Sequence, residues 1–242
     1  MSFALILPTL NEIYGLRATV PRLDRGLFER IVVVDGGSTD GTVAYAREQG
    51  LEVIFQEGRE LNNAQRTAFL QVGSAYVIMF SPDGNCIPEL LPRLCALLAE
   101  GNHDMVIVSR YLDGARSDDD DLLTGFGNGM FTGIINLLFR SRFTDTLSIF
   151  RGYRSEAIRA MNLPEIARES RLRAAMPLLN SWEVASCLRA PRLGLRCGEI
   201  AGDEPARIGG IRKMGIVRNG LATVGAILLD FFFYWPHTEP QN

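Results

Sequence analysis

Short apolar runs alternate with longer segments of helical spacing along the first hundred residues. The run Ile31–Val34 is rich in β-branched residues, which is typical of a strand buried on both faces. Strands separated by helices predict an α/β fold with a mostly parallel central sheet flanked by helices. The expected strands are Phe3–Leu7, Arg30–Val34, Glu52–Phe55, Tyr76–Phe80 and Met105–Ser109, and the expected helices are Gly15–Leu23, Thr42–Gln49, Asn62–Val72 and Pro88–Ala99.

The pattern is less regular after Ser109. The segment from Asp113 to Asp121 is polar and acidic, which predicts a loop with a solvated run of aspartates. The apolar helix expected over 122–139 carries Thr and Asn at four-residue spacing, so its polar groups share one face. Further on we expect a polar cluster at 144–153, a helix at 183–189, a strand at 193–199, a basic Gly-rich loop at 205–213 and an apolar C-terminal helix at 216–234.

Composition narrows the class of protein only slightly. The 242 residues are 47% hydrophobic and 22% charged, which is ordinary for a globular protein. The net charge of −3 gives no reason to expect a nucleic-acid partner. The first expected strand begins without a charged and apolar leader, which predicts a cytoplasmic protein. The longest apolar segment, Leu221–Trp235, contains Asp230 and is short for a membrane span.

Polar residues follow the first two expected strands. Asp35 begins the sequence Asp-Gly-Gly-Ser-Thr-Asp-Gly-Thr, and Pro8 begins Pro-Thr-Leu-Asn-Glu. Open α/β sheets bind ligands at the carboxyl ends of their strands. The loop after Asp35 offers a carboxylate and glycines but no lysine, so it suits a base and ribose better than a phosphate. Asp40 is expected to cap the helix that follows.

Together these two loops resemble the nucleotide-binding half of family 2 glycosyltransferases, which have the GT-A fold. By motif, the chain is most similar to dolichyl-phosphate mannose synthases and polyprenyl-phosphate glycosyltransferases. The likeness continues through Ser81-Pro82-Asp83, Ser109-Arg110-Tyr111, the segment 145–151 and the segment 207–213. It implies a glycosyltransferase domain at 1–215, with a nucleotide-binding half (1–110) and an acceptor half (111–215), followed by a C-terminal helix and tail (216–242).

The resemblance also implies roles for particular residues. Asp83 matches the last acid of the family's D-x-D metal motif, whose first acid is replaced by Ser81. Asn85 matches a position that supplies an oxygen ligand, so the implied metal site is Asp83 with Asn85 and the implied cofactor is Mg²⁺ or Mn²⁺. The remaining substrate-binding residues would be Pro8, Asn11, Glu12 and Asp35 around the nucleotide, and Arg110, Arg151, Arg207 and Lys213 on phosphate oxygens.

The implied reaction is inverting transfer of a sugar from a nucleoside diphosphate to a polyprenyl phosphate or a glycan. A hydroxyl acceptor needs a general base, and Asp145 and Glu183 are the two catalytic candidates. Two alternatives stay open: a non-catalytic nucleotide-sugar-binding protein, because of Ser81, and a sugar-phosphate nucleotidyltransferase, which is disfavoured because the first strand is not followed by a Gly-rich basic loop. A NAD-binding Rossmann enzyme would need a G-x-G-x-x-G sequence that the chain lacks after that strand.

The C-terminal helix carries one further prediction about partners. Its apolar stripe comprises Leu221, Val224, Leu228, Phe232 and Trp235. Such a stripe packs on its own domain, pairs with a second copy in a homodimer, or lies at the inner face of a membrane beside a lipid-linked acceptor.

Overall fold

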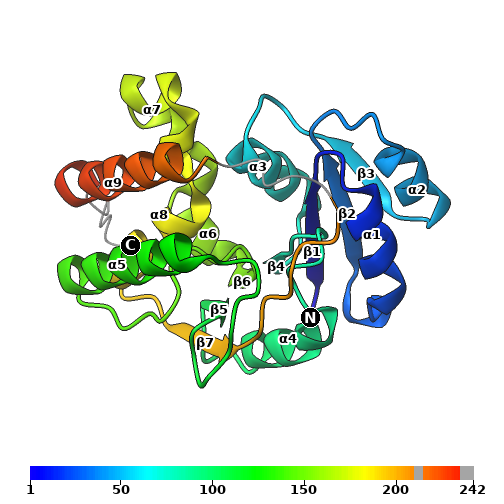
Figure 1. Ribbon diagram of the computed structural model, residues 1–242, viewed down its shortest axis with the longest axis horizontal. Coiled ribbons are helices and arrows are strands. Elements are labelled where there is room, and N and C mark those ends of the chain that lie inside the picture. The colour runs from blue at the N-terminus through cyan, green and yellow to red at the C-terminus, as the bar shows by residue number, and fades with distance from the viewer. Residues whose placement is uncertain (210–214, 235–242) are drawn as a thin grey trace, which may run out of the picture.

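The computed structural model describes residues 1–209 and 215–234, except the side chains of Leu122 and Ile216, and its strands form one sheet. The strand order is β3-β2-β1-β4-β6-β5-β7, and every strand except β6 runs in the same direction (Figure 1). The predicted α/β fold is therefore confirmed. The strands are β1 (Phe3–Thr9), β2 (Arg30–Asp35), β3 (Glu52–Phe55), β4 (Tyr76–Met79), β5 (Met105–Ser109), β6 (Arg151–Arg154) and β7 (Cys197–Ala201).

Helices cover both faces of the sheet, so the molecule has three layers (Figure 1). Alternate residues of β1 enter two separate cores: Ala4 and Ile6 face one layer, and Leu5 and Leu7 face the other. This alternation explains the continuous apolar run that predicted the strand. The helices are α1 (Ile13–Thr19), α2 (Thr42–Glu48), α3 (Leu61–Val72), α4 (Leu91–Ala99), α5 (Leu122–Phe139), α6 (Ser155–Ala160), α7 (Arg171–Ala175), α8 (Trp182–Arg192) and α9 (Ile216–Phe233).

Strand β6 departs from the sequence prediction, which placed only a polar cluster there. It runs antiparallel between β4 and β5, so residues after position 110 add strands to the same sheet as residues 1–110. Helix α8 also continues through Pro191, and β7 therefore starts at Cys197 rather than at Leu193. Because β6 is antiparallel, the segment that leads into it lies at the edge where the parallel strands end.

Helix α9 is held by buried charge. Asp230 has no exposed surface and forms ion pairs with Arg173 of α7 and Arg189 of α8, the latter at 2.6 Å. Arg192 donates hydrogen bonds to the carbonyl oxygens of Asp230 and Tyr234 at the end of the helix. This explains the aspartate in an apolar segment. Within the described ranges, every helix is too short or too polar to cross a bilayer.

The predicted stripe of α9 does not pack on its own domain. Leu221, Val224, Leu228 and Phe232 are all exposed, whereas Ala226 and Ile227 enter the core. Trp235, the last residue of that stripe, lies outside the described residues. The stripe therefore faces outward, which excludes the first of the three explanations offered for it.

Candidate active site

The predicted nucleotide residues meet at the carboxyl ends of β1 and β2. The register places Pro8 opposite Val34 and Thr9 opposite Asp35. The Asp35 carboxylate is buried and accepts hydrogen bonds from the backbone N–H groups of Gly37 and Ser38 at 2.8 and 2.9 Å. The carboxylate thus fixes the turn that follows its own strand.

The loops after β1 and β2 are joined by hydrogen bonds. Asn11, in the left-handed region with φ 55°, donates its N–H to Ser38 Oγ and accepts from the Thr39 N–H through Oδ1, both at 2.8 Å. The N–H of the buried Glu12 donates to Thr42 Oγ1 at 3.0 Å. The two predicted nucleotide loops therefore form one surface.

Asp40 caps two helices at this edge. Its carboxylate accepts from the N–H of Thr42 at 3.0 Å and from the N–H of Ile13 at 3.1 Å, at the starts of α2 and α1. Burial raises the pKa of Asp40, but the hydrogen bonds from Thr42 and Ile13 outweigh it and lower the pKa. The predicted capping role is confirmed, and the cap on α1 is an addition to it.

The third loop follows β4 and carries the predicted metal residues. Asp83 is buried, and its carboxylate lies 2.8 Å from NH1 of Arg207. The Asn85 amide donates to Asp119 Oδ2 at 3.2 Å, whereas Asn85 Oδ1 is buried without a hydrogen-bond partner. Ser81, which replaces the first acid of the motif, is only partly buried beside them.

Residues 205–209 lie over this loop. The N–H of Ile208 donates to the carbonyl oxygen of Asp83 at 2.8 Å. The Ile208 side chain rests on Gly84, which has φ 97°, and a Cβ there would lie 2.6 Å from it. Glycine is thus required both by the backbone angle and by the close approach. Lys213 lies outside the described residues.

The residues present fit a hard divalent cation. Such a cation prefers carboxylate and amide oxygens as ligands. Asn85 Oδ1 is a buried acceptor that accepts no hydrogen bond. Within residues 1–209 and 215–234, no three His, Cys, Asp or Glu side chains gather closely enough to hold a metal. Asp83 and Asn85 would therefore need further ligands from a diphosphate and water.

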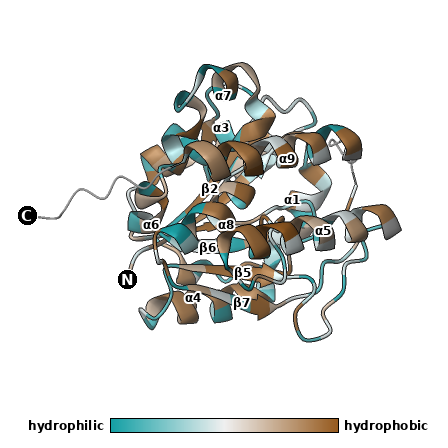
Figure 2. Ribbon diagram, turned by 90° about the vertical axis from the view of Figure 1, so that its left-hand side faces the viewer, coloured by the Kyte–Doolittle hydropathy of each residue, from teal (hydrophilic) through white to brown (hydrophobic). Residues whose placement is uncertain are grey.

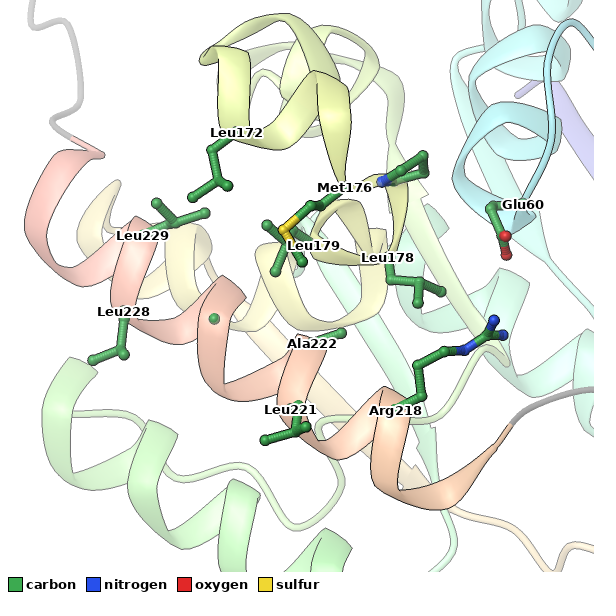
Figure 3. Close-up of a pocket in the computed structure, with 12 residues that line it drawn as sticks. Glu60, Leu172, Met176, Leu178, Leu179, Arg218, Leu221, Ala222, Leu228 and Leu229 are labelled. Carbon is green, nitrogen blue, oxygen red and sulfur yellow. The ribbon is translucent and has the colours of Figure 1, made fainter.

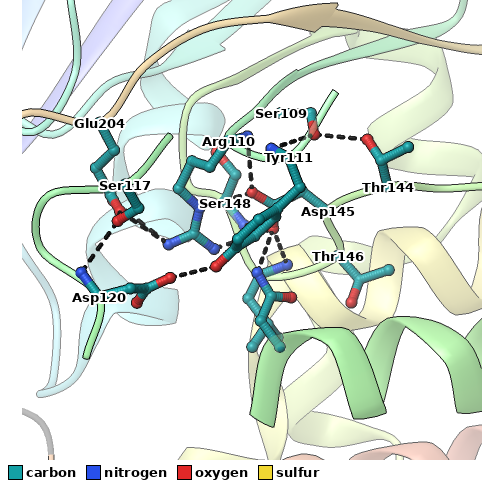
Figure 4. Close-up of polar contacts among 12 residues, drawn as sticks. Ser109, Arg110, Tyr111, Ser117, Asp120, Thr144, Asp145, Thr146, Ser148 and Glu204 are labelled. Carbon is teal, nitrogen blue, oxygen red and sulfur yellow. Dashed lines mark hydrogen bonds and ion pairs between the residues drawn. The ribbon is translucent and has the colours of Figure 1, made fainter. Parts of the chain in front are cut away.

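Arg110 and Asp145 form the centre of a second buried cluster (Figure 4). Nε and NH2 of Arg110 lie 2.6 and 3.0 Å from the two oxygens of Asp145, and NH1 lies 3.1 Å from Glu204. The predicted polar face of α5 points into this cluster, because Asn128 donates to Asp145 Oδ1 at 3.0 Å. Thr132 of the same face contacts Thr146 at 3.0 Å.

These contacts give Arg110 and Asp145 structural partners in addition to the roles predicted for them. Asp145 has no exposed surface, and its oxygens also accept from the N–H groups of Leu147 and Ser148. Burial raises the pKa of Asp145, but the hydrogen bond and charge of Arg110 outweigh burial, so the pKa is lowered overall. A carboxylate that is paired with an arginine in this way is a weak base for an acceptor hydroxyl. The guanidinium of Arg110 is already paired with the carboxylates of Asp145 and Glu204, so it is not free to bind a phosphate.

Arg151, which was predicted to meet phosphate oxygens, lies inside the core. Its side chain is 0% exposed, and its guanidinium donates to the carbonyl oxygens of Ser148 and Glu183 and to Ser186 Oγ. It ties β6 to α8 from inside the core and does not reach a substrate. Position 151 lies in a central strand, where the side chain faces the packed layer rather than the sheet edge.

Glu183 lies in the first turn of α8. Its carboxylate accepts from Gln65 Nε2 at 2.5 Å and from Ser181 Oγ at 2.8 Å. Both partners are neutral, unlike those of Asp145. Among the described residues, the Asp145 carboxylate forms an ion pair with an arginine, whereas the Glu183 carboxylate does not.

Sequence reasoning missed the roles of four acids at this edge. Asp119 contacts Asn85 and lies 4.0 Å from Arg207, and Asp120 accepts from Tyr111 Oη, so these two members of the acidic run are not merely solvated surface charges. Asp121 caps α5 through the N–H groups of its first turn. Glu204, which pairs with Arg110, follows the parallel strand β7, so the rule that ligands gather at carboxyl ends of strands could have found it.

The mostly parallel α/β sheet, with acidic turns at the carboxyl ends of its strands, has the arrangement expected for the predicted GT-A fold. The family model for glycosyl transferase family 2 matches residues 4–161, which is more than half of the chain. The protein therefore belongs to glycosyl transferase family 2, and the predicted resemblance is confirmed.

Individual relatives agree with this assignment. The chain is 29% identical over 234 residues to an undecaprenyl-phosphate mannosyltransferase of Micrococcus luteus, covering 90% of each. It is 29% identical over 160 residues to the glycosyltransferase AglJ of Haloferax volcanii, covering 66% of this chain. The chain spans about half the length of AglJ and of a second curated relative, at 52% and 42%.

Solved structures share the fold. Glucosyl-3-phosphoglycerate synthase of Mycobacterium tuberculosis, in complex with Mn²⁺, UDP-glucose and glycerol 3-phosphate, superimposes with a TM-score of 0.64. The sequence identity is 16%, and the match covers 95% of this chain and 79% of that chain. At this identity the likeness shows the fold alone.

Proposed function

We propose that this protein transfers a sugar from a nucleoside-diphosphate sugar to a phosphate or hydroxyl acceptor, with inversion at the anomeric carbon. The observation that carries the proposal is the meeting of three loops at one sheet edge, which brings Asp35, Asn11 and Asp83 to the ends of neighbouring strands. Solved structures of the same fold contain UDP-glucose and Mn²⁺, which supports a nucleotide-sugar donor and a divalent cation.

The chemistry asks mainly for stabilisation of a departing diphosphate. The loops after β1 and β2 hold the base and ribose, with Asp35 and Asn11 at the positions that the family uses. Asp83 and Asn85 would hold a divalent cation, which supplies positive charge to the diphosphate when bound. Arg207, which lies on Asp83, and Lys213 neutralise the remaining negative charge.

The acceptor decides whether a base is required. A phosphate acceptor is already anionic and attacks without losing a proton. A hydroxyl acceptor must lose one, and Glu183 is the carboxylate that we assign to that step, because its partners Gln65 and Ser181 are neutral. Asp145 instead orients Arg110 and the segment that leads into β6.

Two neighbouring helices support a lipid-linked acceptor and contact with a membrane surface. Figure 2 shows the largely apolar α5 and α9 side by side on the outside of the molecule. Together they carry one exposed charged side chain, Arg218, since Asp230 is buried. Patches of this extent mark interaction sites, and the named relative acts on a lipid phosphate. The apolar face comprises Leu123, Phe126, Met130, Ile134, Leu137 and Leu138 of α5 and Val217, Leu221, Val224, Leu228, Phe232 and Phe233 of α9.

A groove beside this apolar face suits an isoprenoid or acyl chain. It has a volume of about 630 Å³ and runs between α9 and the segment 172–179 (Figure 3). Leu172, Met176 and Leu221 line it, and Glu60 and Arg218 lie together at one end. An apolar groove with Arg218 at one end suits a lipid chain whose phosphate group meets that arginine.

The proposal is tested by incubating the full chain with radiolabelled nucleotide sugars, Mn²⁺ or Mg²⁺, and acceptors. The acceptors are a polyprenyl phosphate in vesicles, the matching polyprenol, and a soluble glycan. We expect transfer to the polyprenyl phosphate. Binding of nucleotide sugars without transfer or hydrolysis would instead identify a nucleotide-sugar-binding protein, and formation of a nucleotide sugar from a sugar phosphate would identify a nucleotidyltransferase.

A further inference from the structure

Arg207 occupies an unusual place for an arginine that is to meet phosphate. Its NH1 lies 2.8 Å from Asp83, and its NH2 lies 4.0 Å from Asp119. Its Nε is buried and has no hydrogen-bond partner. A guanidinium placed between two carboxylates with one donor unused is held by charge rather than by a complete set of hydrogen bonds.

Asp119 brings a second carboxylate to a site where position 81 offers only a hydroxyl. It comes from the loop between β5 and α5, and its Oδ2 accepts from the Asn85 amide at 3.2 Å. The side chain is 21% exposed, so it can move. In the arrangement described, the Asn85 amide turns its nitrogen to Asp119 and leaves Oδ1 unpartnered inside the protein. A cation between Asn85 and Asp119 would favour the flipped orientation of the Asn85 amide, because Asn85 Oδ1 and the Asp119 carboxylate could then both face the cation.

We propose that Asp119 is the acid that takes over from position 81, so that Asp83, Asn85 and Asp119 together hold the divalent cation, and that Arg207 is the resident cation of this site when the metal is absent. The inference rests on the proposed function, since it completes the site assigned to Asp83 and Asn85. Residues 205–209 then have two states: with Arg207 on Asp83 the cation site is filled by the protein itself, and with metal bound Arg207 is free for the diphosphate.

The test measures Mn²⁺ binding to the full chain by the electron paramagnetic resonance signal of free Mn²⁺, with no nucleotide or acceptor present. The variants are Asp119→Asn, Arg207→Gln and the control Asp118→Asn, which removes the same charge from the neighbouring exposed position. Circular dichroism and thermal melting verify that each variant is folded. Asp119→Glu is a second variant that keeps the charge and moves the carboxylate by one methylene.

We expect Asp119→Asn to weaken Mn²⁺ binding by about tenfold or more, as loss of a group at a metal site does. Asp118→Asn should change it by less than about twofold, because exposed charges are screened. Arg207→Gln should tighten binding by about tenfold, since it removes a competing cation. Equal effects of the two aspartate substitutions, no tightening in Arg207→Gln, or no Mn²⁺ binding by either wild type or Arg207→Gln would each overturn the inference. Sugar transfer is not the readout, so failure here is distinct from failure of the proposed function.

Discussion

The substitution Asp145→Asn separates a structural carboxylate from a catalytic base. The Asp145 carboxylate accepts from Nε and NH2 of Arg110 at 2.6 and 3.0 Å, from Asn128 at 3.0 Å, and from three backbone N–H groups. Removing one partner of a buried ion pair costs about 3–5 kcal/mol. Arg110 keeps Glu204 as a second partner at 3.1 Å, so we expect the free energy of unfolding to fall by about 3 kcal/mol, the lower end of that range.

Urea unfolding followed by circular dichroism measures this change. The dependence on urea should keep its slope, because the substitution alters stability and not the surface exposed on unfolding. The control is Asp118→Asn, in which an exposed carboxylate of the nearby loop is neutralised, and it should lie within about 0.5 kcal/mol of wild type. A matched slope and a shifted midpoint would assign the loss to the buried pair.

The pH dependence gives an independent check. The folded protein lowers the pKa of Asp145 below its ordinary value of 3.8, so its stabilisation is complete above that value and is lost as the pH falls through the lower, folded pKa. The difference between wild type and Asp145→Asn should therefore be full at pH 7 and should shrink below about pH 4. Wild-type stability in Asp145→Asn, together with abolished transfer to hydroxyl acceptors, would refute the reasoning and restore Asp145 as the base.

Four further variants test the rest of the description. Asp83→Ala should lower kcat at least about 100-fold in a protein that is still folded by circular dichroism, and near-normal transfer would remove the metal-site proposal. Glu183→Gln should lower kcat about 100-fold with hydroxyl acceptors and leave transfer to a phosphate acceptor unchanged, as steady-state kinetics with both would reveal. Asp230→Asn should lower the free energy of unfolding by about 3–5 kcal/mol in urea, because two buried arginines lose their partner; a change under about 1 kcal/mol would contradict this. Leu221→Glu with Leu228→Glu should reduce co-sedimentation with anionic vesicles about tenfold, and a change in oligomeric state without any loss of vesicle binding would indicate a dimer instead.

Much of the fold could be predicted because its signals are local. A strand buried on both faces, such as Arg30–Asp35, needs a continuous apolar run, and the turn after it needs Gly and Asp. Residues at the ends of adjacent parallel strands must then meet at one edge, which brought Asp35 and Asn11 together correctly. These inferences needed no knowledge of distant contacts.

The remaining features depend on contacts between distant segments. Strand β6 contains two arginines in four residues, and only the carbonyl oxygens around Arg151 make its burial favourable. The acidic run was interpreted as a solvated surface because charge runs usually are, yet Asp119 contacts a residue 34 positions away. The stripe on α9 predicted an apolar face correctly, but periodicity alone does not say whether that face turns toward the core or toward the outside.

The segment after β7 connects both clusters of the candidate site, and its contacts differ along its length. Glu204 pairs by backbone hydrogen bonds with residues 116–118, at 2.8 Å in each direction, and its side chain holds Arg110. Three residues later the chain contacts the loop after β4, through Arg207 on the Asp83 carboxylate and through the N–H of Ile208 on the Asp83 carbonyl oxygen. A substitution at Asp83 therefore removes the ion pair of Arg207 but keeps the backbone hydrogen bond of Ile208. Because Glu204 and Arg110 are held by other partners, the buried ion pairs around Arg110 do not depend on the contacts that a cation at Asp83 would replace.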